Sequence, residues 1–342
     1  MKRRTLLMSA SAQLLCVACG QALAQAPASY PSRPIRLVVP FAAGTAPDIL
    51  GRLVAPALAE SMSANVVVEN VPGAGGTIGV GRVARSAPDG HTLLLSGDAA
   101  LVLTGGAYGV KPPYDTLRDL APIAQLMVTP NVLVVANDVP ARTVQELVAL
   151  VRSKPGKFSY SSGGIGFSQH RAGELMNSMA GLDMVHVPNP GSPWPDVISG
   201  RTQLLFGNIA LALPMMKDGK VRALAVTSTT RSPTAPELPT VSESGLPGFE
   251  SISWFGVLAP AGTPPAVLQR LEAELQKAMA SPAMKERLAT MGATPGVQNA
   301  AGFTQVIQNE IRRWAPKAGA AAGAAGGPSL ASASVAAAAQ KP

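Results

Sequence analysis

Residues 35–70 read IRLVVPFAAGTAPDILGRLVAPALAESMSANVVVEN and alternate short β-branched runs with a helical pattern. The apolar run 35–39 predicts a strand, 48–62 have helical spacing, and 66–69 predict a second strand. The rhythm continues with a helix over 78–87 and strands over 92–95, 132–135, 158–161, 184–187, 203–206 and 222–226. Such alternation indicates mainly parallel sheets covered by helices, which is the α/β class.

Two helix starts carry local signals. Thr143 is followed three residues later by Glu146, a capping-box pattern. A second helix is expected after Thr263, with Pro264 at its first position.

The amino terminus has the pattern of a secretory signal peptide. Lys2, Arg3 and Arg4 precede an uncharged stretch that ends in small residues, so we predict a signal over 1–24, with cleavage after Ala24 or alternatively after Ala26. Ser, Gln and Gly interrupt the stretch, which argues against a membrane anchor. Arg3-Arg4 leaves both the Sec and the twin-arginine route open, and either delivers the protein to the periplasm.

Both cysteines, Cys16 and Cys19, lie inside this signal. Acylation of Cys19 would make a lipoprotein, but the usual Leu is missing three residues before it. After cleavage the chain would have no cysteine for a disulfide, a thiolate metal site or a nucleophile.

The remaining length is enough for two domains, each with its own core. Loss of the three basic residues of the signal lowers the formal net charge from +8 to +5. A modest positive charge suits anionic solutes. The basic residues form no run or stripe, so no nucleic-acid partner is predicted.

Two glycine-rich turns, 39–48 and 71–79, each lead from a strand into a helix. Glycine lets the backbone come close to a ligand, and unpaired N–H groups at a helix start attract an anion such as a carboxylate or phosphate. The alternative is that glycine only permits the tight turn. Gly73, Gly75 and Gly79 are spaced one residue too long for a dinucleotide fingerprint, and no P-loop ending follows, so no cofactor is predicted.

A third loop, 161–170, also ends a strand and opens a helix. Residues 166–170 superficially resemble a nucleophile elbow, but His170 stands where glycine normally fits, and Ser168 is better interpreted as a helix N-cap. A Ser-His-Asp triad needs its members to meet only in space, so this alternative stays open.

The three histidines, His91, His170 and His186, show no i, i+4 spacing, and no metal site is predicted. His91 belongs to a turn and is interpreted as structural. His186 falls inside an apolar strand, where we expect a hydrogen-bonded core histidine.

Several motifs occur together in a fixed order. They are Tyr30-Pro31-Ser32-Arg33-Pro34-Ile35-Arg36, Val68-Glu69-Asn70, Pro72-Gly73-Ala74-Gly75-Gly76, Ala87-Pro88-Asp89-Gly90, Arg222-Ala223-Leu224-Ala225-Val226-Thr227-Ser228, Pro239-Thr240-Val241, Gly245-Leu246-Pro247-Gly248, Trp254-Phe255-Gly256 and Ala259-Pro260-Ala261-Gly262-Thr263-Pro264. In this order the chain resembles the Bug-type, TctC-like periplasmic receptors of the tripartite tricarboxylate transporter systems, from about Tyr30 to Trp314.

The resemblance implies a two-domain α/β periplasmic-binding-protein fold of type II, a Venus flytrap with its ligand cleft between the domains. Domain 1 would comprise residues 30–128 plus 252–316 and domain 2 residues 129–251. The Ala/Gly-rich tail 317–342 is expected to be disordered or only partly helical. A monomeric receptor that is not an enzyme and binds a small carboxylate is implied.

The resemblance also implies a binding site. In domain 1, backbone groups of two turns would hold the carboxylate, and their site residues are Phe41, Ala43, Gly44, Thr45, Asp48, Gly75, Gly76 and Thr77. The facing wall of domain 2 would come from Ser161, Ser162, Phe167, Gln169, Asn189 and Asn208, the last in a turn with Gly207.

Some positions depart from the family pattern. Thr45 replaces a glycine, Asn189-Pro190 stand where Tyr-Lys is common, Trp194 is unusual, and Gly207 stands where Asp often precedes Asn208. The missing charges favour an uncharged or aromatic far end of the ligand over a tricarboxylate. Three functions remain: a receptor feeding membrane transporter subunits, a receptor presenting its ligand to a sensor, and a serine hydrolase using Ser168.

Overall fold

The structure, a computed structural model, describes residues 30–102, 112–189, 192–296 and 298–322. The predicted signal peptide, Pro190 and the tail beyond residue 322 lie outside the described residues. Helix α12 runs over Ala300–Ala322 and so includes the start of the tail 317–342, which was expected to be disordered or only partly helical. Over 317–322 the helical alternative replaces disorder, because these alanine-rich residues continue an existing helix. None of the described helices combines the length and apolar character that crossing a bilayer requires.

The strands are β1 (Ile35–Val39), β2 (Val66–Asn70), β3 (Thr92–Gly97), β4 (Leu120–Val135), β5 (Phe158–Ser162), β6 (Met184–Pro188), β7 (Leu204–Asn208), β8 (Arg222–Val226), β9 (Ile252–Pro260) and β10 (Thr294–Pro295). The helices are α2 (Ala46–Met62), η1 (Ala74–Gly76), α3 (Thr77–Ala84), α4 (Asp98–Val102), α5 (Thr116–Asp119), α6 (Val144–Arg152), α7 (Ser168–Ala180), α8 (Trp194–Ile198), α9 (Ile209–Lys217), α10 (Pro265–Ala280), α11 (Pro282–Thr290) and α12.

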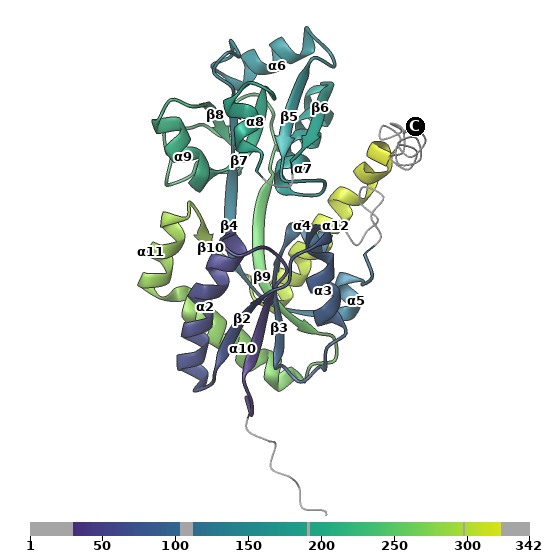
Figure 1. Ribbon diagram of the computed structural model, residues 1–342, viewed down its shortest axis with the longest axis vertical. Coiled ribbons are helices and arrows are strands. Elements are labelled where there is room, and N and C mark those ends of the chain that lie inside the picture. The colour runs from purple at the N-terminus through teal and green to yellow at the C-terminus, as the bar shows by residue number, and fades with distance from the viewer. Residues whose placement is uncertain (1–29, 103–111, 190–191, 297, 323–342) are drawn as a thin grey trace, which may run out of the picture.

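The strands form one sheet in the order β2-β1-β3-β9-β4-β7-β5-β6, with β8 and β10 paired to β4 (Figure 1). The pairs β1–β2, β1–β3, β5–β6 and β5–β7 are parallel, as the alternation of strands and helices predicts. The long strands β4 and β9 run antiparallel to each other and join the two ends of the molecule.

Strand β4 changes partners along its length. Residues 120–130 pair with β9, whereas 131–135 pair with β7 and β8. The change supports dividing the chain near residue 129, as the resemblance implies. We refer to residues 30–128 plus 252–316 as the first half and to residues 129–251 as the second half.

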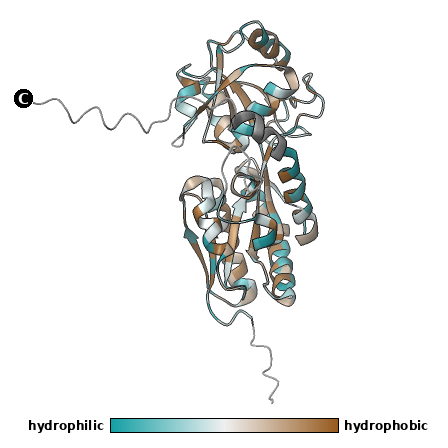
Figure 2. Ribbon diagram, turned by 90° about the vertical axis from the view of Figure 1, so that its right-hand side faces the viewer, coloured by the Kyte–Doolittle hydropathy of each residue, from teal (hydrophilic) through white to brown (hydrophobic). Residues whose placement is uncertain are grey.

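The strands are apolar because many of them are covered on both faces. In β1, Leu37 and Val39 face one hydrophobic cluster and Val38 faces another. Near-continuous apolar runs are typical of parallel strands buried on both sides. In Figure 2 the strands are mostly brown, the colour of hydrophobic residues, and they lie between helices that carry both brown and teal, the colour of hydrophilic residues.

The core is not divided as cleanly as two domains with separate cores would require. One cluster lies in the first half, under α2 and α10. The larger cluster covers the other face of that sheet and continues into the second half through β4. The halves therefore share apolar packing along the crossover strands.

The helix starts follow local chemistry. Thr143 caps α6 as predicted and accepts a hydrogen bond from Glu146 N, but the Glu146 carboxylate accepts one from Arg142 N, the residue before the cap, and not from the cap itself. Pro264 was predicted to be the first residue of α10, but it is the N-cap, and the helix begins at Pro265. Helix α3 ends at Ala84 rather than 87, with Arg85 as its C-cap. Ala87 itself precedes a proline, which disfavours helical backbone at that residue.

Candidate functional site

The carboxyl ends of the parallel strands meet at the boundary between the halves. In the first half, β1, β2 and β3 end in the loops that open α2, η1 and α4. In the second half, Asn208 at the end of β7 donates to Thr129 on the crossover strand β4, with Nδ2 3.2 Å from Oγ1. Loops after the carboxyl ends of strands are where open α/β sheets bind ligands.

The loop between β1 and α2 is organised by Asp48. This buried carboxylate accepts hydrogen bonds from Gly44 N at 2.8 Å, Asn70 Nδ2 at 2.9 Å and Arg52 Nε at 3.1 Å. Burial by itself would raise the pKa of Asp48, but the bonds from Arg52, Gly44 and Asn70 outweigh it and hold this pKa below its ordinary value. Asp48 therefore remains an anion that shapes the loop.

Asn70 ties this loop to the next one. Its Nδ2 also donates to the Phe41 carbonyl at 3.1 Å, so one amide joins the end of β2 to both ends of the β1–α2 loop. The hydroxyl of Thr45 donates to the Ala42 carbonyl at 2.7 Å. Ala43 and Gly44 stay exposed at the tip.

The loop between β2 and α3 depends on left-handed backbone. Gly73, Gly75 and Gly76 have φ of 132°, 66° and 95°, values that side chains rarely allow. The Gly76 amide donates to the Gly73 carbonyl at 2.9 Å, so its expected role as a direct donor to an anion would compete with this bond. A Cβ at Gly76 would lie 3.0 Å from Ala100 Cβ and 3.5 Å from the Phe41 ring, which places two predicted site residues in contact.

Thr77 is the first residue of α3 and is buried. Its hydroxyl donates to the Ala74 carbonyl at 2.9 Å and closes the η1 turn. The side chains of Thr45 and Thr77 thus both stabilise their loops. The amides at the starts of α2 and α3 stand at the boundary, where the dipoles of the two helices favour an anion.

The loop between β5 and α7 faces the boundary from the second half. Gln169 Oε1 accepts from Gly163 N at 2.7 Å, and Ser162 Oγ accepts from Gly164 N at 3.0 Å. The Phe167 ring lies beside Gly163 and Gly164. Ser162, Phe167 and Gln169, predicted together from the sequence, are therefore neighbours.

Ser168 is not the N-cap of α7, as the sequence suggested. Phe167 occupies the cap, and Ser168 is the first helical residue. Its hydroxyl accepts from Asn131 on β4 at 3.0 Å and from Ser253 on β9 at 2.7 Å. The serine links α7 to both crossover strands, which explains why it is polar and buried.

The buried His170 and the partly buried His186 lie side by side behind this loop. Their ring centroids are 4.1 Å apart, His186 Nε2 lies 2.6 Å from Ser162 Oγ, and His170 Nδ1 accepts from Gly166 N at 3.2 Å. Burial lowers the pKa of His170 to about 3, helped by the nearby His186 and Arg171, and burial lowers the pKa of His186 to about 4. Both rings are neutral near pH 7 and hold the loop in place.

His91, interpreted as structural, is buried beside the ring of Tyr30. Its Nε2 accepts a hydrogen bond from Ser32 N at 3.2 Å.

The rest of the expected wall is held by internal bonds. Asn189 Nδ2 donates to the buried Asp196 carboxylate at 2.9 Å, and Ser161 Oγ donates to the Pro193 carbonyl at 3.1 Å. Asn208 Oδ1 accepts from Ala210 N at 3.0 Å and caps α9.

Trp194 and Gly207 form a steric pair in the same wall. A Cβ at position 207 would collide with the six-membered ring of Trp194, which is itself buried. The tryptophan thus fills the space that an aspartate at 207 would need. The two departures from the family pattern are therefore linked, because the tryptophan ring at 194 can pack here only when residue 207 has no side chain.

An ion pair across the boundary was not predicted. Arg171 of α7 pairs with Asp98 at the start of α4, and both side chains are almost fully buried. The guanidinium lies 5.3 Å from the Trp314 ring centroid and 3.9 Å from the Glu310 carboxylate on α12. No sequence signal joins residues so far apart, although a charged residue inside an amphipathic helix is a weak hint.

The described residues include no group of three or more His, Cys, Asp or Glu placed to hold a metal ion. Within the same residues, no hydrogen bond of the Ser168 hydroxyl reaches a histidine. What the two sets of loops offer is neutral hydrogen-bonding groups and helix starts on facing surfaces, an arrangement suited to binding an anion.

Comparison with known proteins identifies relatives of this chain. Residues 50–319 match the family model described as the tripartite tricarboxylate transporter family receptor. Protein BugT of Bordetella pertussis is 35% identical over 289 residues, covering 84% of this chain and 89% of BugT.

Two solved structures share the fold along nearly their whole length. R. palustris Rpa4515 with adipate gives a TM-score of 0.75 at 32% identity, covering 86% of this chain and 98% of that one. MatC from Rhodopseudomonas palustris with bound malate gives 0.74 at 30% identity, covering 84% and 99%. The second of these relatives holds a small dicarboxylate in a fold that this chain shares.

Proposed function

Since the chain belongs to the family of tripartite tricarboxylate transporter receptors, a family of solute-binding rather than catalytic proteins, we propose that it captures a small carboxylate between its halves in the periplasm and delivers it to membrane transporter subunits. The observation that carries the proposal is the meeting of two sets of strand-end loops at one boundary. The adipate and malate named with two relatives support the choice of a carboxylate.

The first-half loops supply the carboxylate end of the site. Asp48 and Asn70 fix the β1–α2 loop, and the glycines of 73–76 keep the start of α3 open to a ligand. Helix dipoles and backbone amides at the helix starts stabilise an anion without a counter-charge on a side chain. Binding through backbone groups would tolerate many different carboxylates.

The second-half wall selects among them. The predicted wall residues have neutral side chains, and Trp194 closes the space beside Gly207. The nearby guanidinium of Arg171 is already paired with Asp98. A ligand whose far end is uncharged or aromatic fits this wall better than a tricarboxylate, because a second charge would be desolvated without a partner.

A thermal-shift screen of carboxylates tests the proposal. A ligand at 100 times its Kd stabilises the folded state by about 2.7 kcal/mol, a shift that is easily measured. We expect monocarboxylates with an apolar or aromatic body to give the largest shifts, dicarboxylates such as adipate smaller ones, and citrate the smallest. If no carboxylate raises the midpoint of unfolding, the proposed function is wrong.

A further inference from the structure

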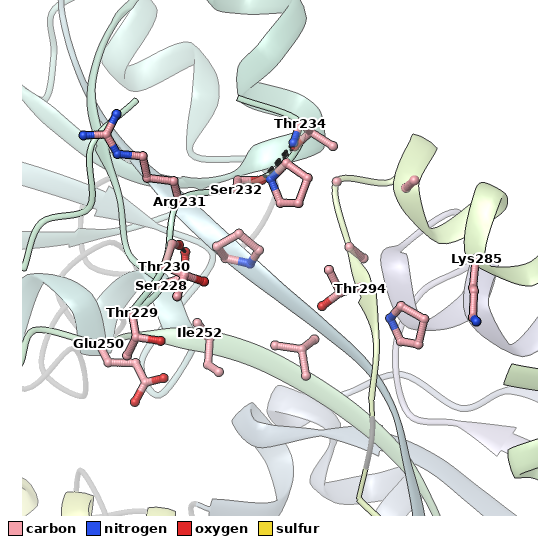
Figure 3. Close-up of a pocket in the computed structure, with 17 residues that line it drawn as sticks. Ser228, Thr229, Thr230, Arg231, Ser232, Thr234, Glu250, Ile252, Lys285 and Thr294 are labelled. Carbon is pink, nitrogen blue, oxygen red and sulfur yellow. Dashed lines mark hydrogen bonds between the residues drawn. The ribbon is translucent and has the colours of Figure 1, made fainter. Parts of the chain in front are cut away.

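A hollow opens at the same boundary but away from the loops described above (Figure 3). Its volume is about 420 Å³, and its lining includes none of the residues predicted to bind the carboxylate. The floor is formed by Val128 and Pro130 of β4 and Ile252 of β9, the two crossover strands. One wall is the loop 228–234 of the second half, and the other is α11 with β10 of the first half. We call it the hinge cavity.

The interior of the hinge cavity is apolar with a few hydroxyl groups. Besides its apolar floor it is bordered by Pro233 and Ala289. The hydroxyls of Thr229, Thr230 and Thr294 make no hydrogen bond to any other described residue, and Figure 3 shows them around the opening. They remain available to a ligand that accepts or donates hydrogen bonds.

The charges at the edge leave the centre uncharged. Arg231 pairs with Glu243 at 3.1 Å and points away from the opening, and the Glu250 carboxylate lies 3.8 Å from Arg313. Lys285 stands at the far end beyond Thr294. Away from Lys285, an ion placed on the apolar floor would lose its hydration without gaining a partner, so this part of the cavity favours an uncharged occupant.

From these features we propose that the hinge cavity is a second ligand site, which takes a small uncharged molecule with an apolar body and one or two hydrogen-bonding groups. Its volume falls within the range of about 300–1,000 Å³ of small-molecule sites, which are mostly apolar with a few placed polar groups and often lie between domains. The proposal does not depend on the identity of the carboxylate.

The position of the cavity couples it to domain movement. Its walls belong to different halves and its floor to the strands about which they rotate, so rotation changes its shape. A molecule that fits one orientation better shifts the equilibrium toward it. By linkage, the hinge ligand then changes carboxylate affinity, and the carboxylate changes affinity for the hinge ligand by the same factor.

Straight-chain alcohols from 1-butanol to 1-octanol serve as probes in saturation-transfer NMR with the full chain. We expect binding that strengthens by about fourfold per methylene until the cavity is full. Ala289 is exposed at the border of the cavity, so Ala289→Phe places a ring inside it. The ring should weaken alcohol binding at least about tenfold, because the alcohol then loses its contacts with the apolar floor. Ala283→Phe is the matched control, an exposed alanine on the same helix outside the cavity, and should bind as the wild type does.

The proposal is overturned if no alcohol binds, or if the Ala289→Phe variant binds alcohols as well as the Ala283→Phe variant does. It is also overturned if the alcohols occupy the carboxylate site. In that case adipate would compete with them, and the Gly76→Val variant, not Ala289→Phe, would lose alcohol binding. The coupling is measured by titrating adipate with and without saturating 1-hexanol, and a change in Kd of at least about threefold is expected. Absence of any adipate binding would count against the proposed function, while the alcohol data would still decide the hinge cavity.

Discussion

Substitutions at two glycines of the loop between β2 and α3 should distinguish the effect of backbone strain from the effect of steric crowding. Gly75 and Gly76 both have left-handed φ, but an added Cβ meets nothing within 4 Å at Gly75 and Ala100 at 3.0 Å at Gly76. Gly75→Ala should therefore show only the strain cost of roughly 1 kcal/mol in folding stability. Gly76→Ala should in addition displace the loop that we propose faces the ligand.

We predict that Gly76→Ala weakens every bound carboxylate by about tenfold or more, the equivalent of one charge-assisted hydrogen bond, while Gly75→Ala changes affinity by less than about threefold. Isothermal calorimetry on both variants measures this difference. Equal losses would mean that loop strain, and not the contact with Ala100, controls the site.

Trp194 is predicted to control ligand size. Trp194→Leu opens the space beside Gly207, so longer ligands such as adipate should gain about tenfold relative to malate, while acetate should change little. Competition binding with the three acids gives the ratio. An unchanged ratio would place the ligand's far end elsewhere in the wall.

Among elements, α7 and β6 hold a pH-sensitive contact. The folded-state pKa values of His170 and His186, about 3 and about 4, lie below the ordinary value of 6.5. Their neutral packing thus contributes stability that is fully present above about pH 6.5. It is lost as the pH falls, because the unfolded chain takes up protons that the folded chain does not.

Between about pH 6 and pH 4, each histidine should lower the unfolding free energy by up to about 1.4 kcal/mol per pH unit. Urea unfolding at pH 7, 6 and 5 measures the slope, and His170→Phe, which cannot take up a proton, should flatten it. His91→Phe is the control on a different element. A wild-type slope unaffected by His170→Phe would show that other groups dominate acid sensitivity.

At the same scale, most elements could be predicted from the sequence. Strands β5, β6 and β7 agree with the predicted runs within one or two residues, since β-branched and apolar residues are bounded there by loops. Strand β4 was recognised only over its last four residues. Pro122 and Pro130 break the strand pattern, and the structure accommodates Pro122 at a register shift and Pro130 where the partners change.

The site was predictable to a lesser degree. The glycines indicated the loops of the first half, because glycine is the residue that most readily adopts the left-handed backbone found there. The roles of Asp48 and Asn70 in the first half and of Asn189 in the second half could not be predicted, since each side chain bonds a partner that only the fold brings near. The same holds for Arg171 and Asp98, which only the packing of α7 on α4 brings together.

For the whole molecule, the Arg171–Asp98 pair is predicted to hold the halves together. Removing one member leaves the other charge buried and unpaired, so Arg171→Ala should cost about 3–5 kcal/mol of unfolding free energy. Arg118→Ala removes an exposed ion pair with Asp119 and should cost less than about 1 kcal/mol. Denaturant unfolding of both variants makes the comparison, and equal costs would contradict a structural role for the buried pair.

Ligand binding should also change the overall shape. The halves are joined by the crossover strands β4 and β9 and by the Arg171–Asp98 pair. We expect them to rotate about the crossover strands, so that a bridging ligand closes them. Small-angle scattering should show a smaller radius of gyration at saturating carboxylate. An unchanged scattering profile at saturation would rule out closure as the response.

The pairing of β3 with β9 has a consequence for the order of events during synthesis. Strand β3 ends at Gly97, yet its neighbour begins only at Ile252, after the entire second half has been made. The parallel strands β5, β6 and β7 lie close together in sequence and can assemble first. We expect the nascent chain to acquire its earliest protected amides in the second half, with the first half completed last, when β9 arrives between β3 and β4.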